Sequence, residues 1–300
     1  MSGGREFDVV VWGATGFTGR LVAEYLLDRY GVEDDLSWAI GGRSAERLAA
    51  VREDLGPGAA ALELVVGDAA RPDDMSSLAE RTQVVCTTVG PYATYGSELV
   101  DACVGAGTDY CDLTGELHWM RSMIDRHVDG AAESGARIVH ACGFDCIPSD
   151  LGVFFLQQQM QERHGVPSPR VRMGVAGFSG SVSGGTVASM LAMMEAGRDD
   201  PSVQEVIDDP YGLNPSGERY GPDDPDRLRA ELDPVFGQWT GPFVMGPVDT
   251  KVVRRTNALL DHAYGRDFRY DECLLTGTGP VGRAKATAMA AGLGGGQAAV

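Results

Sequence analysis

A short apolar run that breaks into three evenly spaced glycines constrains this chain more than any other feature. The run, residues 9–12, is rich in β-branched side chains, as in a buried parallel strand. It leads directly to Gly13, Gly16 and Gly19. From Leu21 onward, apolar residues recur with the period of a helix. The glycines are therefore predicted to form a turn from a strand into a helix.

A turn of this kind can hold a pyrophosphate, because a helix N-terminus offers unpaired N–H groups and the positive end of the helix dipole. Gly13 would make the tight turn, Gly16 would let phosphates approach the backbone, and Gly19 would let the helix pack on the strand. The spacing differs from the commoner G-x-G-x-x-G, so a purely structural turn is the alternative. The cofactor-binding residues predicted in this turn are Gly13, Thr15, Gly16, Phe17, Thr18 and Gly19.

Strand-like and helical segments alternate through the first half of the chain, which predicts an α/β fold with a doubly wound parallel Rossmann-type sheet. We expect this dinucleotide-binding domain to cover residues 1–149 and a smaller α+β substrate domain to cover residues 150–300. In the second domain, residues 198–246 are expected to form loops and residues 248–253 a strand. The glycines of residues 281–300 make that stretch a poor free helix that either lies on a membrane or packs inside the fold.

The end of the second predicted strand indicates which dinucleotide is bound. Arg43 and Ser44 stand where an NAD site would have a carboxylate for the ribose hydroxyl, so NADP(H) is favoured over NAD(H). The alternative is that Arg43 is a surface cation. Asp68, at the next strand end, either accepts from the adenine amino group or is a turn residue. Val89 and Gly90 end the fourth strand and are predicted to face the nicotinamide half of the cofactor.

Composition narrows the function classes. Asp and Glu outnumber Lys and Arg by 43 to 25, and a surface this negative argues against nucleic-acid binding. The acidity reflects either a high-salt habitat or a biased genome. His140, Cys142 and Cys146 lack a matching fourth ligand, so no metal site is predicted. No stretch reaches about 18 uninterrupted apolar residues, so we expect a cytoplasmic protein, at most peripheral to a membrane.

Several motifs together resemble the saccharopine-dehydrogenase-like oxidoreductases, most closely their bacterial branch of trans-acting enoyl reductases. The motifs that carry this resemblance are residues 11–19, 41–44, 89–92, 111–116, 143–152, 177–180, 183–186 and 264–270. This sequence departs from the family pattern at two places. Cys146 stands where the family more often has serine, and the sequence ends soon after Gly296, where relatives continue. We therefore expect the substrate domain to be incomplete at its C-terminus.

The resemblance implies an NADPH-dependent reduction of a carbon–carbon double bond in a polyketide or fatty-acyl chain during lipid synthesis. The substrate would be a small molecule or an acyl thioester, presented free, on a carrier protein or at a membrane surface, and a homodimer is compatible with it. For the proton step, Tyr92 is predicted to be the hydroxyl nearest the nicotinamide, with Asp112 and Asp145 as orienting or relay groups. Each of the three can instead be a capping residue.

Two further functions stay open. The first is oxidation or reduction of an amino-acid imine, whose carboxylates would need a cluster of cations such as Arg254 and Arg255. The second is a sensor or scaffold that binds NADP(H) without turnover.

Overall fold

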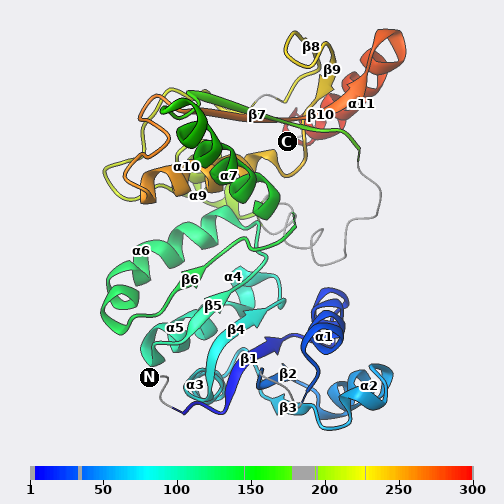
Figure 1. Ribbon diagram of the computed structural model, residues 1–300, viewed down its shortest axis with the longest axis vertical. Coiled ribbons are helices and arrows are strands. Elements are labelled where there is room, and N and C mark those ends of the chain that lie inside the picture. Colours follow the sequence, from blue (N-terminus) through cyan, green and yellow to red (C-terminus); the bar gives the residue numbers. More distant parts are fainter. Residues whose placement is uncertain are drawn as a thin grey trace. The chain divides into compact units, whose positions relative to one another are not determined.

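A computed structural model describes residues 4–32, 36–144, 146–177, 193, 195–226 and 228–298 (Figure 1). The chain divides into two compact units. The first comprises residues 1–143 and 183–195, and the second comprises residues 144–182 and 196–300. The predicted domain boundary near Ser149 falls inside the first helix of the second unit.

The first unit is built on a six-stranded parallel sheet in the order β3-β2-β1-β4-β5-β6. Its strands are β1 (Phe7–Trp12), β2 (Trp38–Gly42), β3 (Glu63–Val66), β4 (Thr82–Thr87), β5 (Asp109–Cys111) and β6 (Ile138–Val139). The strand order reverses between β1 and β4, and a crevice for a dinucleotide opens at such a switch point, beyond the carboxyl ends of the strands. The predicted Rossmann-type sheet is confirmed.

Helices cover both faces of this sheet (Figure 1). They are α1 (Phe17–Tyr30), α2 (Ala45–Asp54), the short η1 (Pro57–Ala59), α3 (Pro72–Arg81), α4 (Tyr92–Tyr95), α5 (Ser97–Ala106) and α6 (Leu117–Ser134). Fully buried Val11, Ile40 and Leu48 belong to the core that joins α1 and α2 to the sheet. Helix α5 packs against both α3 and α6. Apolar burial of this kind fixes the glycine turn between β1 and α1.

The second unit has a smaller, mixed sheet in the order β7-β10-β9-β8, in which only β7 and β10 run parallel. Its strands are β7 (Arg170–Val175), β8 (Glu231–Asp233), β9 (Gln238–Gly241) and β10 (Arg269–Gly277). Its helices are α7 (Cys146–His164), α9 (Pro201–Asp208), α10 (Gly246–Leu259) and α11 (Gly279–Ala298). Val153 of α7 and Val253 of α10 share a core cluster with Tyr270 of β10.

The structure corrects two sequence expectations in this unit. Residues 248–253 lie in helix α10, not in a strand; Pro247 in the first turn was the missed sign of a helix start. Residues 198–246 contain α9, β8 and β9 and are not only loops. Residues 281–298 lie in helix α11, which packs on β9, as in the second of the two alternatives for this stretch: a Cβ added at Gly241 would lie 3.4 Å from the Ala286 Cα. This packing outweighs the low helix propensity of the glycines.

Within the described part of the chain, no helix is both long enough and apolar enough to cross a membrane.

Candidate functional site

The glycine turn is shaped by side chains from the loop that follows the neighbouring strand β4. Gly13 has a left-handed φ of +95°, and a Cβ at that position would lie 2.6 Å from Val89 Cγ2. A Cβ at Gly19 would lie 2.7 Å from Thr88 Oγ1 and would overlap the carbonyl oxygen of Gly13. Both positions therefore require glycine for the fold itself.

Gly16 differs, because it is exposed and its Cβ would only approach the Gly13 carbonyl oxygen at 3.3 Å. It is the N-cap residue of α1, and none of the described side chains caps this helix end or places a carboxylate in its first turn. The first N–H groups of the helix thus keep their capacity to bind an anion. Thr15 and Thr18 are half-buried beside this end, and Phe17 is exposed. The turn fits a pyrophosphate.

The tip of β2 brings cations to the same turn. Arg43 is exposed, and Ser44 accepts a hydrogen bond from the backbone N–H of Arg47 at 3.2 Å, which caps helix α2. The Arg47 guanidinium donates to the carbonyl oxygen of Thr15 at 3.4 Å. A ligand phosphate at the turn would therefore meet a guanidinium from the α2 end as well as backbone N–H groups.

Asp68, at the end of β3, acts as a turn residue in this structure. Its carboxylate accepts from the backbone N–H of Ala70 at 3.1 Å, and its own N–H donates to Asp74 Oδ2 at 2.9 Å. One carboxylate oxygen is thus used locally. The adenine contact of Asp68 stays a prediction.

The loop after β4 leads into helix α4, which holds Tyr92. Val89 donates its N–H to Thr87 Oγ1 at 3.3 Å, and Gly90 follows it. The Tyr92 hydroxyl is buried: it donates to the carbonyl oxygen of Thr87 at 3.3 Å and accepts from the Leu113 N–H at 3.4 Å. Burial, with the nearby Asp112 carboxylate, raises the pKa of Tyr92 well above its ordinary value. These contacts hold the ring in place, and a proton-donor role for Tyr92 stays a prediction.

Glu116 is a buried carboxylate that the sequence analysis did not single out. It accepts the backbone N–H groups of Tyr92 and Ala93, each at 2.8 Å, and so caps helix α4. A carboxylate favours a helix N-terminus because of the helix dipole.

Asp112, just beyond β5, is enclosed and fully engaged. Its Oδ1 accepts the backbone N–H groups of Thr114 at 3.0 Å and Ala141 at 2.9 Å, and its Oδ2 accepts the Tyr110 hydroxyl at 2.9 Å. The same Oδ2 lies 2.7 Å from His140 Nδ1. The third predicted catalytic residue, Asp145, lies outside the described residues.

The register of the strands places several of these residues on one level of the sheet. Trp12 pairs with Thr87, and the pairs Cys86–Cys111 and Cys111–Val139 put Asp112 and His140 one position further along. The glycine turn, the β2 tip, the loop after β4 and the Asp112–His140 pair thus all lie at the carboxyl edge of the sheet. Sequence reasoning treated His140 only as a metal-ligand candidate. Its place after a strand end, as for Asp112, was the available signal.

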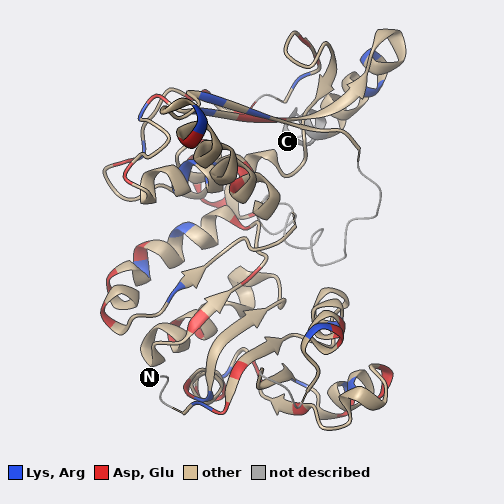
Figure 2. Cartoon of the chain, viewed as in Figure 1, with Lys and Arg blue, Asp and Glu red and all other residues tan. Residues whose placement is uncertain are grey.

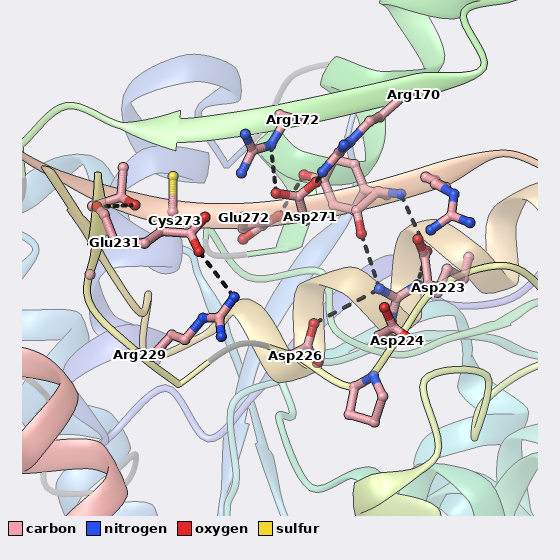
Figure 3. Close-up of a pocket in the computed structure, with 16 residues that line it drawn as sticks. Arg170, Arg172, Asp223, Asp224, Asp226, Arg229, Glu231, Asp271, Glu272 and Cys273 are labelled. Carbon is pink, nitrogen blue, oxygen red and sulfur yellow. Dashed lines mark hydrogen bonds and ion pairs between the residues drawn. The ribbon is translucent and has the colours of Figure 1, made fainter. Parts of the chain in front are cut away.

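The second unit contains a charged pocket, and its sheet carries acidic and basic segments side by side (Figure 2). Figure 3 shows the residues that line it, contributed by all four strands of the sheet, α10 and the segment before β8. Arg172 pairs with Asp271 at 2.7 Å, and Arg254 pairs with Asp223 at the same distance. Arg254 also donates to the carbonyl oxygens of Pro210 and Tyr270. Arg170 and Arg229 are likewise paired, with Asp271 at 2.9 Å and Glu231 at 3.5 Å.

Arg255, the second member of the cationic pair noted in the sequence, donates to the carbonyl oxygen of Leu213 at 2.6 Å. Arg254 and Arg255 are therefore both used in holding the second unit together.

Comparison with known proteins gives a family. Residues 9–139 match the family model of the saccharopine dehydrogenase NADP-binding domain. A Mycobacterium tuberculosis H37Rv protein, named as a candidate trans-acting enoyl reductase, is 48% identical over 91% of this chain and 66% of its own length. A trans-acting enoyl reductase of Mycobacterium ulcerans is 44% identical over 97% of this chain and 71% of its own length. The chain thus spans about two thirds of the length of these relatives.

Among solved structures, apo saccharopine dehydrogenase (L-Glu forming) from Saccharomyces cerevisiae matches with 15% identity and a TM-score of 0.41. That match covers 53% of this chain and 32% of the yeast chain.

Proposed function

This chain belongs to the saccharopine-dehydrogenase-like family, close to its trans-acting enoyl reductases, and on that premise we propose that it reduces an enoyl thioester with NADPH in polyketide or fatty-acyl lipid synthesis. The first unit carries the NADP-binding domain of the family. The relatives are named for enoyl reduction, and the chain matches them over nearly all of its own length.

One observation carries the cofactor part of the proposal: an uncapped helix end at Gly16 lies beside the arginines of the β2 tip. Backbone N–H groups at the turn would hold the pyrophosphate, and exposed Arg43 would bind the ribose 2′-phosphate. Val89 and Gly90 would border the nicotinamide. When bound, NADPH would supply the hydride for the β-carbon of the substrate.

The imine alternative has less support. A substrate with several carboxylates would need unpaired cations, whereas Arg254 and Arg255 are engaged by groups of the chain. We therefore rank an enoyl thioester above an amino-acid imine.

The cofactor assignment is tested by titrating NADPH and NADH into the protein and its Arg43→Ala variant, followed by nicotinamide fluorescence. Loss of one charged phosphate contact costs about 1.5–3 kcal/mol, so Arg43→Ala should weaken NADPH binding roughly 10- to 100-fold and leave NADH binding unchanged. The matched control is Arg29→Ala, an exposed arginine in the last turn of α1, which should change neither affinity.

The reaction is tested by NADPH oxidation with crotonyl-CoA and trans-2-octenoyl-CoA. Turnover with either thioester supports enoyl reduction. Tight NADPH binding without oxidation, across both thioesters and a panel of imines, would instead indicate a nucleotide sensor or scaffold. A chain that binds no NADPH would refute the cofactor assignment.

A further inference from the structure

We propose that His140 is the proton donor of the reduction, with Asp112 as the residue that positions it. The proposal rests on the proposed function, because it assigns the group that completes the enoyl reduction. It starts from the pair itself: His140 Nδ1 lies 2.7 Å from a carboxylate oxygen whose side chain is fully buried.

Asp112 can orient the imidazole because its own position is fixed on all sides. Two backbone N–H groups and the Tyr110 hydroxyl hold its two oxygens. One of those N–H groups belongs to Ala141, which adopts a left-handed φ of 59°. Non-glycine residues rarely take this conformation, and such strain is concentrated at functional sites. The left-handed backbone at Ala141, after β6, thus directs its N–H group to the carboxylate that holds His140.

The imidazole is held in one orientation and one tautomer. Its ring lies edge-to-face with Trp119 at 5.0 Å and with Tyr110 at 5.8 Å between ring centroids. Since Asp112 accepts from Nδ1–H, the second nitrogen, Nε2, is the one available for proton exchange. Nε2 has no hydrogen bond with a described residue. A carboxylate that fixes the base in this way is the arrangement used by acid–base histidines in general.

The position of the pair in the sheet suits a proton donor. Asp112 and His140 follow β5 and β6, which lie beyond β4 on the side of the switch point away from the glycine turn. In this topology the second mononucleotide half of the cofactor lies over those strands. Neighbouring strands are about 4.8 Å apart, so His140 lies two strands, or roughly 10 Å, along the sheet from the β4 end.

Other donors in the described chain are less suited. The Tyr92 hydroxyl already donates to the Thr87 carbonyl oxygen. The Lys251 ammonium is buried, donates to the Pro247 carbonyl oxygen at 3.1 Å and lies 3.8 Å from Asp226. The Cys86 thiol is mostly buried, and its contact with Cys111 together with burial raises its pKa far above the ordinary value.

The step balances with one proton. Hydride addition forms a C–H bond at the β-carbon, and the π pair of the double bond moves to the α-carbon. The Nε2–H bond of the His140 imidazolium then breaks as a C–H bond forms at the α-carbon. The thioester chain is reduced by two electrons, the nicotinamide is oxidised by two, and His140 is reprotonated by the one solvent proton that the overall reaction consumes.

The first test measures proximity without turnover, through carbethoxylation of histidines by diethyl pyrocarbonate and mass spectrometry of the peptides. His140 should react in the free protein and be protected at least fivefold by saturating NADP+. His127 is the internal control, and NADP+ should not slow its reaction. It belongs to a second His–Asp pair, between α6 and α5, in which its Nε2 lies 2.7 Å from Asp101 Oδ1. An unreactive His140, or one whose reaction NADP+ does not slow, would overturn the proposal.

The second test compares His140→Gln with His127→Gln, which removes the histidine of the other His–Asp pair, away from the carboxyl edge. General acid catalysis is worth roughly 10²- to 10⁴-fold. We expect kcat for crotonyl-CoA reduction to fall by about that factor in His140→Gln, with the Kd for NADPH unchanged and partial rescue by added imidazole. His127→Gln should keep kcat within about threefold.

The outcomes separate this proposal from the proposed function. Normal kcat in His140→Gln, with turnover intact in the unaltered protein, overturns the assignment of His140 and leaves enoyl reduction standing. A parallel loss in His127→Gln, or a loss of NADPH binding in His140→Gln, would show a structural role and also overturn it. An unaltered protein that binds NADPH but reduces no enoyl thioester overturns both.

Discussion

The three glycines of the β1–α1 turn are evenly spaced, but they serve different purposes. The fold itself demands Gly13 and Gly19, because side chains there would run into Val89, Thr88 and the Gly13 carbonyl group. A Cβ at Gly16 would meet only the Gly13 carbonyl oxygen, at 3.3 Å, a tight contact but not the overlap found at the other two glycines. Its lack of a side chain matters most when a ligand approaches the backbone.

Alanine substitutions should separate these two roles. Gly19→Ala should lower the free energy of unfolding by several kcal/mol, since overlap with a backbone carbonyl cannot be relieved by a rotamer change. Gly16→Ala should lose far less stability in urea than Gly19→Ala yet bind NADPH at least tenfold more weakly. Gly105→Ala, in helix α5 with nothing near its Cβ, is the control and should stabilise the protein by about 0.5–1 kcal/mol. Equal NADPH affinity in Gly16→Ala would refute close phosphate approach.

Among the elements, the short helix α4 depends on a side chain distant in sequence. With only four residues it cannot be stable alone, and the Glu116 carboxylate binds its first two N–H groups. This cap sets the path of the chain between the end of β4 and Tyr92.

Glu116→Gln tests the cap. The amide keeps one acceptor oxygen but turns an N–H group toward the other backbone N–H, so we expect a loss of roughly 2–3 kcal/mol in urea unfolding and weaker NADPH binding. Glu98→Gln, an exposed residue in the first turn of α5, should change stability by less than about 0.5 kcal/mol. A Glu116→Gln variant as stable as the unaltered chain would show that the cap is dispensable.

The elements that sequence could predict are those specified by local pattern. The β1–turn–α1 unit and the alternating strands and helices were predictable because their apolar periods and glycines lie within a few residues of each other. Helix α10 was not, because its valines suggest a strand while buried Asp249, Lys251 and Arg254 fit a helix only once their partners are in place. The Asp112–His140 pair and the Glu116 cap likewise depend on contacts more than 20 residues apart.

At the scale of the whole molecule, pH acts on stability through buried acids. Burial raises the pKa of Glu272 in the second unit, and the Tyr270 hydroxyl donates to it at 2.5 Å. Above the ordinary value of 4.5, the folded chain keeps a proton that the unfolded chain has released. Stability conferred by this group is therefore lost as pH rises through the raised pKa.

Glu272→Gln should remove that loss, because the amide stays neutral and its oxygen can still accept from Tyr270. Calorimetry should show a Tm gain over the unaltered chain that is larger at pH 8.0 than at pH 5.5. Glu205→Gln, on an exposed position of α9, should show no pH-dependent difference. A gain of equal size at both pH values would exclude proton linkage at Glu272.

Thr88 has a consequence for how sequences of this kind can diverge. Its hydroxyl donates to the Gly13 carbonyl oxygen at 3.3 Å and occupies space that a side chain at Gly13 or Gly19 would need. The glycine turn and the loop after β4 are therefore packed directly against each other. A residue bulkier than threonine at position 88 would need a compensating change in the glycine turn. We therefore expect the glycine turn and the loop after β4 to vary together among related sequences, or not to vary at all.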